Sequence, residues 1–373
     1  MQPLLSFYNF LIMMASLAPR NFAEFIPPPK HLDDDKRPSS PTIMIKKSKR
    51  HEQLLTACTI SLISTYQSCH PDFRYDPSHP TRCLTKPSEP VHNDSYDNEH
   101  YNYLLYVNDK LQSPEGQIYT IIDSLGEGTF GQVVKCKDSQ GQFCAAKVIR
   151  NKPAYYIQGL IEVKILSKLN YELDKDDSSN IVRMKDFFVF RNHLVIIFEL
   201  LSINLFELLR KNGLRGVSLS LIRQITKQML EALCTLEKGN IIHCDMKPEN
   251  VLLHGDKGMI KVIDLGSACF ENATIYTYIQ SRYYRSPEVL LGCPYGPEID
   301  SWSLGCICAE LFIGIPLFPG ANEYDQIYRI IQILGMPTQS MIREGRFKDK
   351  FFVLENEEYR FKTREEYMQV NFK

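Results

Sequence analysis

Three glycines between Gly126 and Val133 form a pattern suited to binding phosphate. The eight residues read Gly-Glu-Gly-Thr-Phe-Gly-Gln-Val, which is a G-x-G-x-x-G-x-V spacing. Because glycine carries no Cβ, backbone N–H groups at these positions can approach a phosphate closely. By itself the pattern is weak, since it also opens dinucleotide-binding folds and arises by chance.

The residues that follow this loop separate the alternatives. Val133 continues directly into Val134–Lys137, which predicts a strand. A dinucleotide site needs a helix there, because the helix N-terminus holds the pyrophosphate. A Walker-type loop is excluded because no Gly-Lys-Ser or Gly-Lys-Thr follows the third glycine. We therefore expect a phosphate-binding loop between two strands.

Lys147 is a charged residue within the apolar stretch Gln142–Arg150, which predicts a further strand. A lysine in such a place is costly unless an anion pairs with it, and either a phosphate or a carboxylate would serve. Glu162, in the middle of a predicted helix, is the carboxylate candidate. The alternatives are an edge lysine that reaches solvent and a solvated glutamate. Because the phosphate-binding loop lies nearby in the sequence, a lysine that reaches solvent together with a solvated glutamate is a weaker interpretation than a lysine paired with an anion.

The densest group of polar side chains lies between His243 and Asn250. The stretch reads His-Cys-Asp-Met-Lys-Pro-Glu-Asn, and Asp264-Leu265-Gly266 follows, with Asp264 standing 19 residues after Asp245. These stretches match H-x-D-x-K-x-x-N and D-x-G in order and spacing. Together with the glycine-rich loop and the lysine–glutamate pair, they make the chain resemble a eukaryotic protein kinase over about residues 101–352.

This resemblance implies a division of catalytic roles. Asp245 would accept the proton of the attacking hydroxyl, and Lys247 would offset the charge on the transferred phosphoryl group. Mg²⁺ prefers oxygen ligands, and Asn250 and Asp264 would supply them to the ions that bridge the ATP phosphates. A lysine at position 247 resembles the serine/threonine kinases, so Ser and Thr of protein substrates are the expected acceptors.

The resemblance also implies an ATP pocket, with ATP and Mg²⁺ as cofactors. Lys147, paired with Glu162, would hold the phosphates. Phe198 would close the back of the pocket, and backbone groups of Glu199 and Leu201 would face the adenine edge. The expected ATP-binding residues are Leu125, Gly126, Glu127, Gly128, Thr129, Phe130, Gly131, Val133, Ala145, Lys147, Phe198, Glu199, Leu201 and Leu253.

Finer features narrow the resemblance. His-Cys-Asp in place of His-Arg-Asp, the stretch 275–288 and the stretch 199–209 look like the dual-specificity tyrosine-regulated kinases, the DYRK family. The runs 103–109 and 312–326 are most similar to the fungal Yak-type branch of that family. Members of this branch phosphorylate their own activation-segment tyrosine, and the matching position is Tyr278. The resemblance therefore implies dual specificity.

Cys244 changes the expected surroundings of that tyrosine. It stands where most kinases have the arginine that helps to hold an activation-segment phosphate, so Arg282 and Arg285 are the expected partners of phosphorylated Tyr278. In a kinase fold the catalytic loop and the start of the activation segment run side by side. The thiols of Cys244 and Cys269 are therefore expected within disulfide reach, with two inert buried cysteines as the alternative.

The elements that must position these residues form two groups. Strands come first and helices afterwards, which predicts an α+β, bilobal kinase fold with a hinge near residues 200–202. The predicted strands are Gln117–Leu125, Gln132–Lys137, Gln142–Arg150 and His193–Glu199, and the clearest predicted helices are Ala154–Leu169 and Leu219–Lys238. The kinase domain is expected over 101–373, with an N-lobe at about 115–199 and a C-lobe at about 203–373.

The end of the sequence departs from the kinase pattern. A C-lobe normally continues with further helices, including one whose arginine pairs with the residue that matches Glu288, but the sequence stops at Lys373. We therefore expect an incomplete C-lobe with exposed apolar surface. This feature supports a second hypothesis, a catalytically silent scaffold.

Composition and the N-terminal region bound the remaining possibilities. The 373 residues carry a formal net charge of −1, so no bulk field attracts nucleic acid or membrane. The eleven cysteines form no C-x-x-C pair, and a reducing compartment is expected.

Residues 1–100 are expected to be a largely disordered extension. Its apolar run Leu4–Leu17 lacks a basic flank for a signal peptide, and its basic cluster Lys46–Arg50 is either a nuclear localisation signal or a solvated charge run. The protein is expected in the cytoplasm, the nucleus or both.

Overall fold

The computed structural model describes residues 56–70, 73, 82–255, 258–274 and 276–371. The chain divides into two units, residues 1–80 and 81–373. Of the first unit the structure describes a helix, α3 (Leu62–Cys69), none of whose side chains is buried. The apolar run Leu4–Leu17 and the basic cluster Lys46–Arg50 lie outside the described residues. Within the described part, no helix is long and apolar enough to span a membrane.

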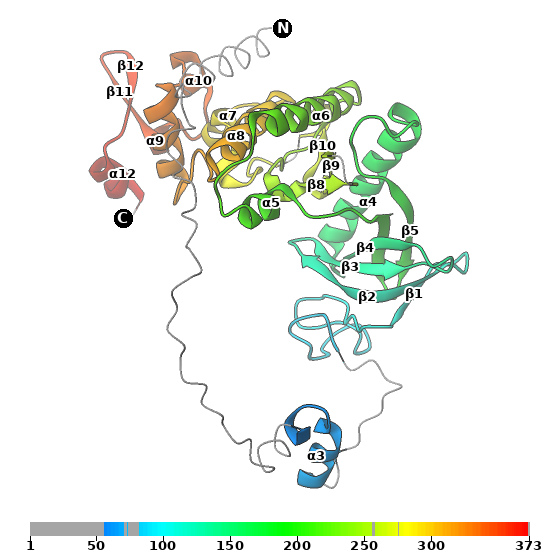
Figure 1. The fold of residues 1–373 in the computed structure, drawn as a ribbon. Helices are drawn as coiled ribbons and strands as arrows, with labels where there is room; N and C mark the ends of the chain where they lie inside the picture. The colour runs from blue at the N-terminus through cyan, green and yellow to red at the C-terminus, as the bar shows by residue number, and fades with distance from the viewer. Residues whose placement is uncertain (1–55, 71–72, 74–81, 256–257, 275, 372–373) are drawn as a thin grey trace, which may run out of the picture. The chain divides into compact units, whose positions relative to one another are not determined.

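The second unit begins with a β-rich lobe (Figure 1). Its six-stranded antiparallel sheet has the order β1-β2-β3-β4-β6-β5, and α4 packs against it. The strands are β1 (Lys110–Gln112), β2 (Ile118–Glu127), β3 (Gly131–Lys137), β4 (Phe143–Ile149), β5 (Met184–Phe190) and β6 (His193–Glu199), and the helical elements are α4 (Pro153–Lys168) and the π-helical turn η2 (Leu169–Leu173). Each predicted strand and the predicted helix of this lobe is therefore confirmed to within two residues at either end.

The sheet forms here because apolar and β-branched side chains face one shared core. Ile121, Val134, Ala146, Val195 and Ile197 come from four strands and are all within one buried cluster. The central strands β4 and β6 are buried almost throughout, and this continuous apolar character is typical of strands covered on both faces. The core thereby fixes the register that places Lys147 on β4.

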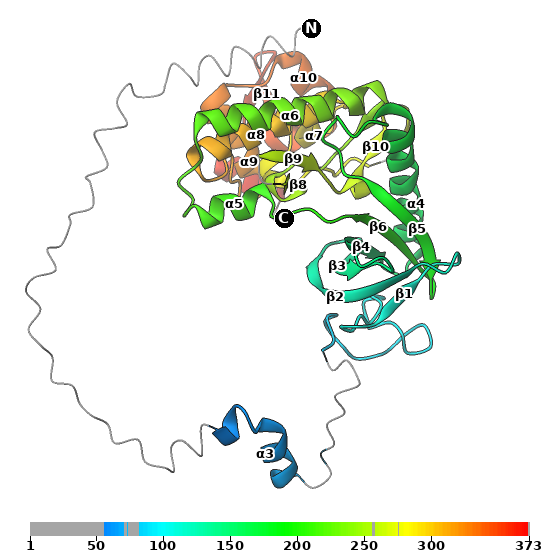
Figure 2. The ribbon, with the colours of Figure 1, turned by 45° about the vertical axis from the view of Figure 1, so that its right-hand side comes forward.

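Residues 82–109 differ from the disordered extension that the sequence indicated up to residue 100. Their backbone forms the isolated bridges Cys83↔Tyr106, His92↔Asp97 and Asp97↔Tyr103. Asp97 is fully buried, and its carboxylate contacts His193 Nε2 on β6 at 2.7 Å. Asp97, one of the polar residues in the stretch that suggested disorder, thus has a partner on the sheet, and the segment lies beside β1 and β2 (Figures 1 and 2). We place the start of the folded unit near residue 82.

The second lobe is mainly helical (Figure 2). Its helices are α5 (Leu205–Lys211), α6 (Leu219–Lys238), α7 (Pro287–Leu291), α8 (Glu298–Ile313), α9 (Glu323–Leu334), α10 (Gln339–Glu344), α11 (Lys348–Phe351) and α12 (Arg364–Asn371), with the 3₁₀ turns η3 (Pro248–Asn250), η4 (Leu265–Ser267), η5 (Glu271–Ala273) and η6 (Arg282–Tyr284). Three short sheets complete it, formed by β7 (Ile241–Ile242) with β10 (Cys269–Phe270), β8 (Val251–His254) with β9 (Met259–Val262), and β11 (Phe352–Glu355) with β12 (Glu358–Phe361).

Helix α6 shows why this lobe folds as it does. Ser218 caps its N-terminus by accepting a hydrogen bond from the backbone of Leu221, and Gly239 follows its last turn. Its apolar residues recur every three to four positions, so one face, including Ile225 and Met229, is buried against α8 and β9. The β-rich first lobe and helical second lobe confirm the predicted bilobal kinase fold.

Candidate active site

Lys147 links the two lobes through two carboxylates. Its Nζ lies 2.7 Å from Glu162 Oε1 on α4 and 2.8 Å from Asp264 Oδ1, which follows β9. Burial alone would lower the pKa of Lys147, but the carboxylates of Asp264 and Glu162 outweigh burial and raise that pKa above its ordinary value. The lysine is therefore a fixed positive charge, as the sequence indicated when it paired Lys147 with Glu162.

The side chain of Asp264 is an anion at neutral pH. Burial alone would raise the pKa of Asp264, but Lys147 lowers it to about 2. Gly266 allows this close approach, because a Cβ at that position would lie 3.1 Å from Lys147 Nζ and 3.2 Å from the ring of Phe130. Asp264 itself has a positive φ of 59°, a strained conformation that tends to occur at functional sites.

The catalytic loop gathers Asp245, Lys247 and Asn250. Lys247 Nζ donates to Asp245 Oδ2 at 2.6 Å, and Asn250 Nδ2 donates to the backbone carbonyl of Asp245 at 2.9 Å. Since the amide nitrogen of Asn250 is used in this way, its Oδ1 is the atom that can bind a cation. All three side chains thus meet where the sequence placed them in one site.

Ser281, which the sequence analysis missed, also contacts the carboxylate of Asp245. Its hydroxyl donates to Asp245 Oδ1 at 2.8 Å, and its backbone N–H donates to the same atom at 3.1 Å. Asp245 is therefore positioned to accept a hydrogen bond from a hydroxyl. The sequence offered no signal for this contact, because 36 residues separate the two positions.

Asp300 on α8 anchors the catalytic loop and was also missed. Its carboxylate accepts hydrogen bonds from the backbone N–H groups of His243 at 2.7 Å and Cys244 at 3.1 Å. Burial raises the pKa of Asp300 to about 6. These bonds support the positive φ of 63° at Cys244, which an unsupported backbone would avoid.

The predicted walls of the ATP pocket come together through strand pairing. Val133 on β3 stands opposite Lys147, and Ala145 stands opposite Phe198 on β6. Leu253 on β8 approaches from the other lobe, where its N–H donates to the carbonyl of Ile203 at 2.9 Å. The loop residues Leu125, Gly126, Glu127, Gly128 and Thr129 are exposed, and Phe130 and Leu201 are half-buried. Gly131 is buried, and a Cβ there would overlap the carbonyl oxygen of Val148.

Glu199 has a role that the sequence analysis did not anticipate. Its backbone N–H donates to the carbonyl of Arg183 at 3.1 Å, so this N–H is not free to contact a nucleotide. Its side chain accepts from Lys261 Nζ at 2.6 Å and from the backbone N–H of Arg183 at 2.9 Å. Lys261 also pairs with Asp177 at 2.7 Å. This network joins the hinge to both lobes, with Lys261 buried and Asp177 exposed.

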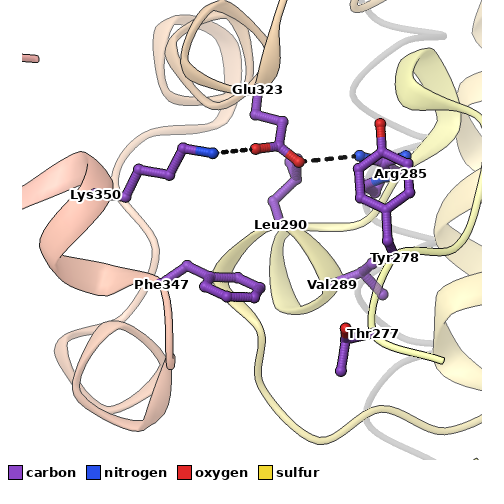
Figure 3. A pocket seen from close by; sticks show the side chains of 8 residues that line it. All are labelled: Thr277, Tyr278, Arg285, Val289, Leu290, Glu323, Phe347 and Lys350. Carbon is purple, nitrogen blue, oxygen red and sulfur yellow. Dashed lines mark hydrogen bonds and ion pairs between the residues drawn. The ribbon is translucent and has the colours of Figure 1, made fainter. Parts of the chain in front are cut away.

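Tyr278 lies against the arginine expected to bind its phosphate (Figure 3). Arg285 Cζ is 4.0 Å from the centre of the Tyr278 ring, and hydrogen bonding to Arg285 lowers the pKa of Tyr278. Glu323 on α9 also contacts Arg285, at 3.4 Å, while its other oxygen contacts Lys350 at 2.5 Å. Arg282 donates to the carbonyl of Ala321 at 2.9 Å, and a hydrogen bond to Arg282 makes a smaller contribution to lowering the pKa of Tyr278. Glu323 and Lys350 are thus members of this cluster that the sequence analysis missed.

A hollow of about 410 Å³ lies beside Lys247 and Ser281. Glu249 and Glu310 line it. Burial raises the pKa of Glu310 to about 7, although a hydrogen bond from the Tyr284 hydroxyl at 2.6 Å opposes the rise. The hollow therefore combines the catalytic loop with acidic side chains.

The family of the chain follows from comparison with known proteins. The sequence model of the family "Protein kinase domain" matches residues 119–358, which is more than half of the chain. The matched region contains the glycine-rich loop, the Lys147–Glu162 pair, the catalytic loop and Asp264. The chain belongs to the protein kinase family.

Individual relatives confirm the narrower resemblance to Yak-type and DYRK-family kinases. The chain is 50% identical over 326 residues to serine/threonine-protein kinase ppk15 of Schizosaccharomyces pombe, a match that covers 86% of this chain and 61% of that protein. It is 51% identical over 300 residues to dual specificity protein kinase YAK1 of Saccharomyces cerevisiae, covering 80% of this chain and 37% of that protein. It is 49% identical over 261 residues to human dual specificity tyrosine-phosphorylation-regulated kinase 4, covering 69% and 49%. The chain thus spans less than two thirds of the length of these relatives.

Proposed function

We propose that the chain is a dual-specificity protein kinase, which transfers the γ-phosphoryl group of ATP to Ser and Thr of protein substrates and to its own Tyr278. The observation that carries this proposal is the position of Lys147 between Glu162 and Asp264, at 2.7 and 2.8 Å. An active kinase needs its lysine–glutamate pair and its metal-binding aspartate in place together. The dual-specificity kinases among the relatives support the same activity.

The residues present fit Mg²⁺ with ATP. Asp264 is anionic, and Asn250 offers an amide oxygen, so both are the hard oxygen ligands that Mg²⁺ prefers. When bound, the metal neutralises charge on the phosphates. Lys147 contributes a fixed positive charge beside Asp264, and the glycine-rich loop contributes backbone N–H groups that can approach the nucleotide.

Asp245 and Lys247 would act on the acceptor. The hydroxyl of Ser281 already donates to Asp245 Oδ1, so a substrate hydroxyl in a similar position would donate its proton to the same carboxylate. Lys247 lies 2.6 Å from Asp245 Oδ2 and would offset charge on the phosphoryl group during transfer.

The hollow beside Lys247 suggests the kind of protein substrate. Glu249 and Glu310 supply carboxylates within reach of a bound peptide. An arginine or lysine side chain near the acceptor residue would pair with Glu249, which is exposed, and would be attracted by the charge of Glu310, which is buried. We therefore propose basic segments of proteins as preferred substrates.

Autophosphorylation tests the proposal directly. Purified chain incubated with Mg-ATP should gain phosphate at Tyr278 and then phosphorylate a basic Ser/Thr peptide, both read by mass spectrometry. Chelation of Mg²⁺ should stop both reactions. A chain that binds no nucleotide and transfers no phosphate would instead be the silent scaffold. Retention of Lys147, Asp245, Asn250 and Asp264 does not favour that alternative.

We further propose that the protein acts in the cytoplasm, the nucleus or both. ATP and protein substrates are available there, and the basic cluster Lys46–Arg50 would direct nuclear import. With a formal net charge of −1, protein substrates are the expected partners, and neither nucleic acid nor membrane is expected to bind. Imaging of the chain with and without Ala substitutions in the cluster tests the nuclear component.

A further inference from the structure

The glycine-rich loop is held at its base by residues that precede the kinase motifs. Glu127, the last residue of β2, and Gln132, the second residue of β3, stand opposite each other in the strand register. Their side chains bond to consecutive residues of the segment 82–109. Asn102 Nδ2 donates to Glu127 Oε1 at 3.0 Å, and Gln132 Nε2 donates to the backbone carbonyl of Tyr103 at 2.9 Å. Both strands that carry the loop are therefore bonded to the same short stretch of chain.

Arg150 at the end of β4 completes this contact. Its Nη2 donates to Glu127 Oε1 at 3.1 Å and reaches the carbonyl of Gly128 at 3.4 Å, while its backbone N–H donates to the carbonyl of Phe130 at 2.9 Å. The next residue, Asn151, donates through its backbone N–H to the carbonyl of Tyr101 at 2.9 Å. Tyr101, Asn102 and Tyr103 are thus bonded to three strand ends around the loop.

The segment that supplies these bonds is itself rigidly anchored. Asn102 is 1% exposed, and its backbone N–H is bonded to Asn98 Oδ1 at 3.0 Å. Asp97 is fully buried and bonded to both His193 and the side chain of Asn151. Asn102 Oδ1 has no hydrogen-bond partner among the described residues, but the other bonds and the burial leave this stretch little freedom to move, so it can restrain a loop that is otherwise exposed.

We propose that Asn102 and Tyr103 form a clamp that positions the glycine-rich loop over the ATP phosphates, with Glu127 and Gln132 as its positioning residues. Between them lie Gly128 to Gly131, whose backbone N–H groups must hold a defined position to bind phosphate. Glycines in this stretch impose little order of their own, since they allow many backbone conformations. Within the loop the N–H of Gly128 donates to the carbonyl of Gly131 at 2.9 Å, and the clamp adds further order from outside the loop. This inference rests on the ATP-dependent activity proposed above.

Nucleotide binding and hydrogen exchange test the clamp on the full chain. Glu127→Ala removes the bonds of Asn102 and Arg150, and Gln132→Glu keeps the size of the side chain but removes the donor to Tyr103. Gln132→Glu should raise the dissociation constant of Mg-ADP and the KM for ATP about fivefold, the size expected for one net hydrogen bond, and Glu127→Ala, which removes two bonds, should raise both by at least as much, with the loss in KM rather than in kcat. Glu127→Gln, which keeps an acceptor for Asn102, should recover part of the loss. Glu115→Ala removes an exposed glutamate of the same lobe and is the matched control.

The exchange measurement separates this inference from the proposed function. Without nucleotide, the amides of residues 128–131 should exchange faster in Glu127→Ala and Gln132→Glu than in the parent chain, whereas Glu115→Ala should match the parent. Asn102→Ala should add nothing to Glu127→Ala, because the bond between these two side chains is already lost in Glu127→Ala. Unchanged exchange and unchanged nucleotide affinity in the clamp variants overturn the clamp. A parent chain that binds no Mg-ADP overturns the proposed function, and the exchange result then still decides the clamp.

Discussion

The thiol sulfurs of Cys244 and Cys269 lie 3.7 Å apart, although 25 residues separate them in the sequence. Cys244 belongs to the catalytic loop, and Cys269 begins the activation segment on β10. A hydrogen bond to Cys269 and burial raise the pKa of Cys244, whereas that same hydrogen bond lowers the pKa of Cys269. The predicted proximity of the two thiols is therefore confirmed, and Cys269 is the one more readily ionised.

Mild peroxide should link these cysteines and depress activity reversibly. Peroxide would oxidise the Cys269 thiolate to a sulfenic acid, and the Cys244 thiol would then attack that sulfur and release water. The disulfide would restrain the activation segment, and dithiothreitol should reduce it and restore activity. Peptide mapping of the oxidised protein measures the bond, and Cys269→Ser should resist inhibition. Two free thiols after oxidation would leave the cysteines as packing residues.

Lys147→Arg should lower phosphoryl transfer by orders of magnitude while the fold persists. The compact ammonium group contacts Glu162 and Asp264 at 2.7 and 2.8 Å, and a planar guanidinium cannot reproduce both contacts in the same space. Steady-state kinetics measure the loss, and circular dichroism with thermal unfolding checks the fold. Activity within about a factor of two of the parent would refute the role of Lys147.

Asp245→Asn and Asp264→Asn should both abolish transfer, but for different reasons. Asp245→Asn removes the proton acceptor of the hydroxyl, so Mg-dependent nucleotide binding should persist. Asp264→Asn removes a cation ligand, so that binding should weaken as well. Calorimetric titration with Mg-ADP separates the two. Equal affinity of both variants for Mg-ADP would show that the division of roles is wrong.

Phosphate on Tyr278 should displace Glu323 from Arg285. A phosphate carries more negative charge than a carboxylate, and the 3.4 Å contact between Glu323 and Arg285 is weak. Glu323 would remain on Lys350, with which it has the shorter contact. Tyr278→Phe should lose most activity, and Tyr278→Glu should not restore it. A fully active Tyr278→Phe variant would contradict this scheme.

Glu323→Gln offers an independent check of that displacement. Without the competing carboxylate, phosphorylated Tyr278 should pair more strongly with Arg285, which lowers the pKa of the phosphate. Titration followed by ³¹P NMR should therefore show a lower phosphate pKa in Glu323→Gln than in the parent. An unchanged phosphate pKa would mean that Glu323 does not compete for Arg285.

Preference for basic substrates should weaken as the pH falls below 7. The pKa of Glu310 is raised to about 7, so this carboxylate is charged above that pH and neutral below it. Its attraction for an arginine is therefore present at pH 8 and largely lost at pH 6. The ratio of kcat/KM for a peptide with an arginine near the acceptor to kcat/KM for its alanine counterpart measures the effect. Glu310→Gln should make the ratio independent of pH over this range.

The sequence by itself determined the motifs and the elements that carry them. A loop that binds phosphate or a metal needs particular residue types a few positions apart. The sequence therefore identified the glycine-rich loop, Asp245, Asn250 and Asp264. Strands β3 and β4 could be predicted because they are short runs rich in apolar and β-branched residues, and helix α4 because its apolar residues recur every three to four positions. Both kinds of information are local, so a linear pattern contains them.

Only the tertiary structure decided which distant residues support that site. Asp97 and His193, 96 positions apart, form one buried pair, and Asn102 meets Glu127 across 25 positions. The polar composition around Asp97 indicated disorder. Composition alone could not show that Asp97 has a partner, because that partner, His193, lies on a strand far along the chain. Asp300 behind the catalytic loop was missed for the same reason. These contacts exist because distant parts of the second unit fold together, and the free energy that holds them comes from burial that no short stretch possesses alone.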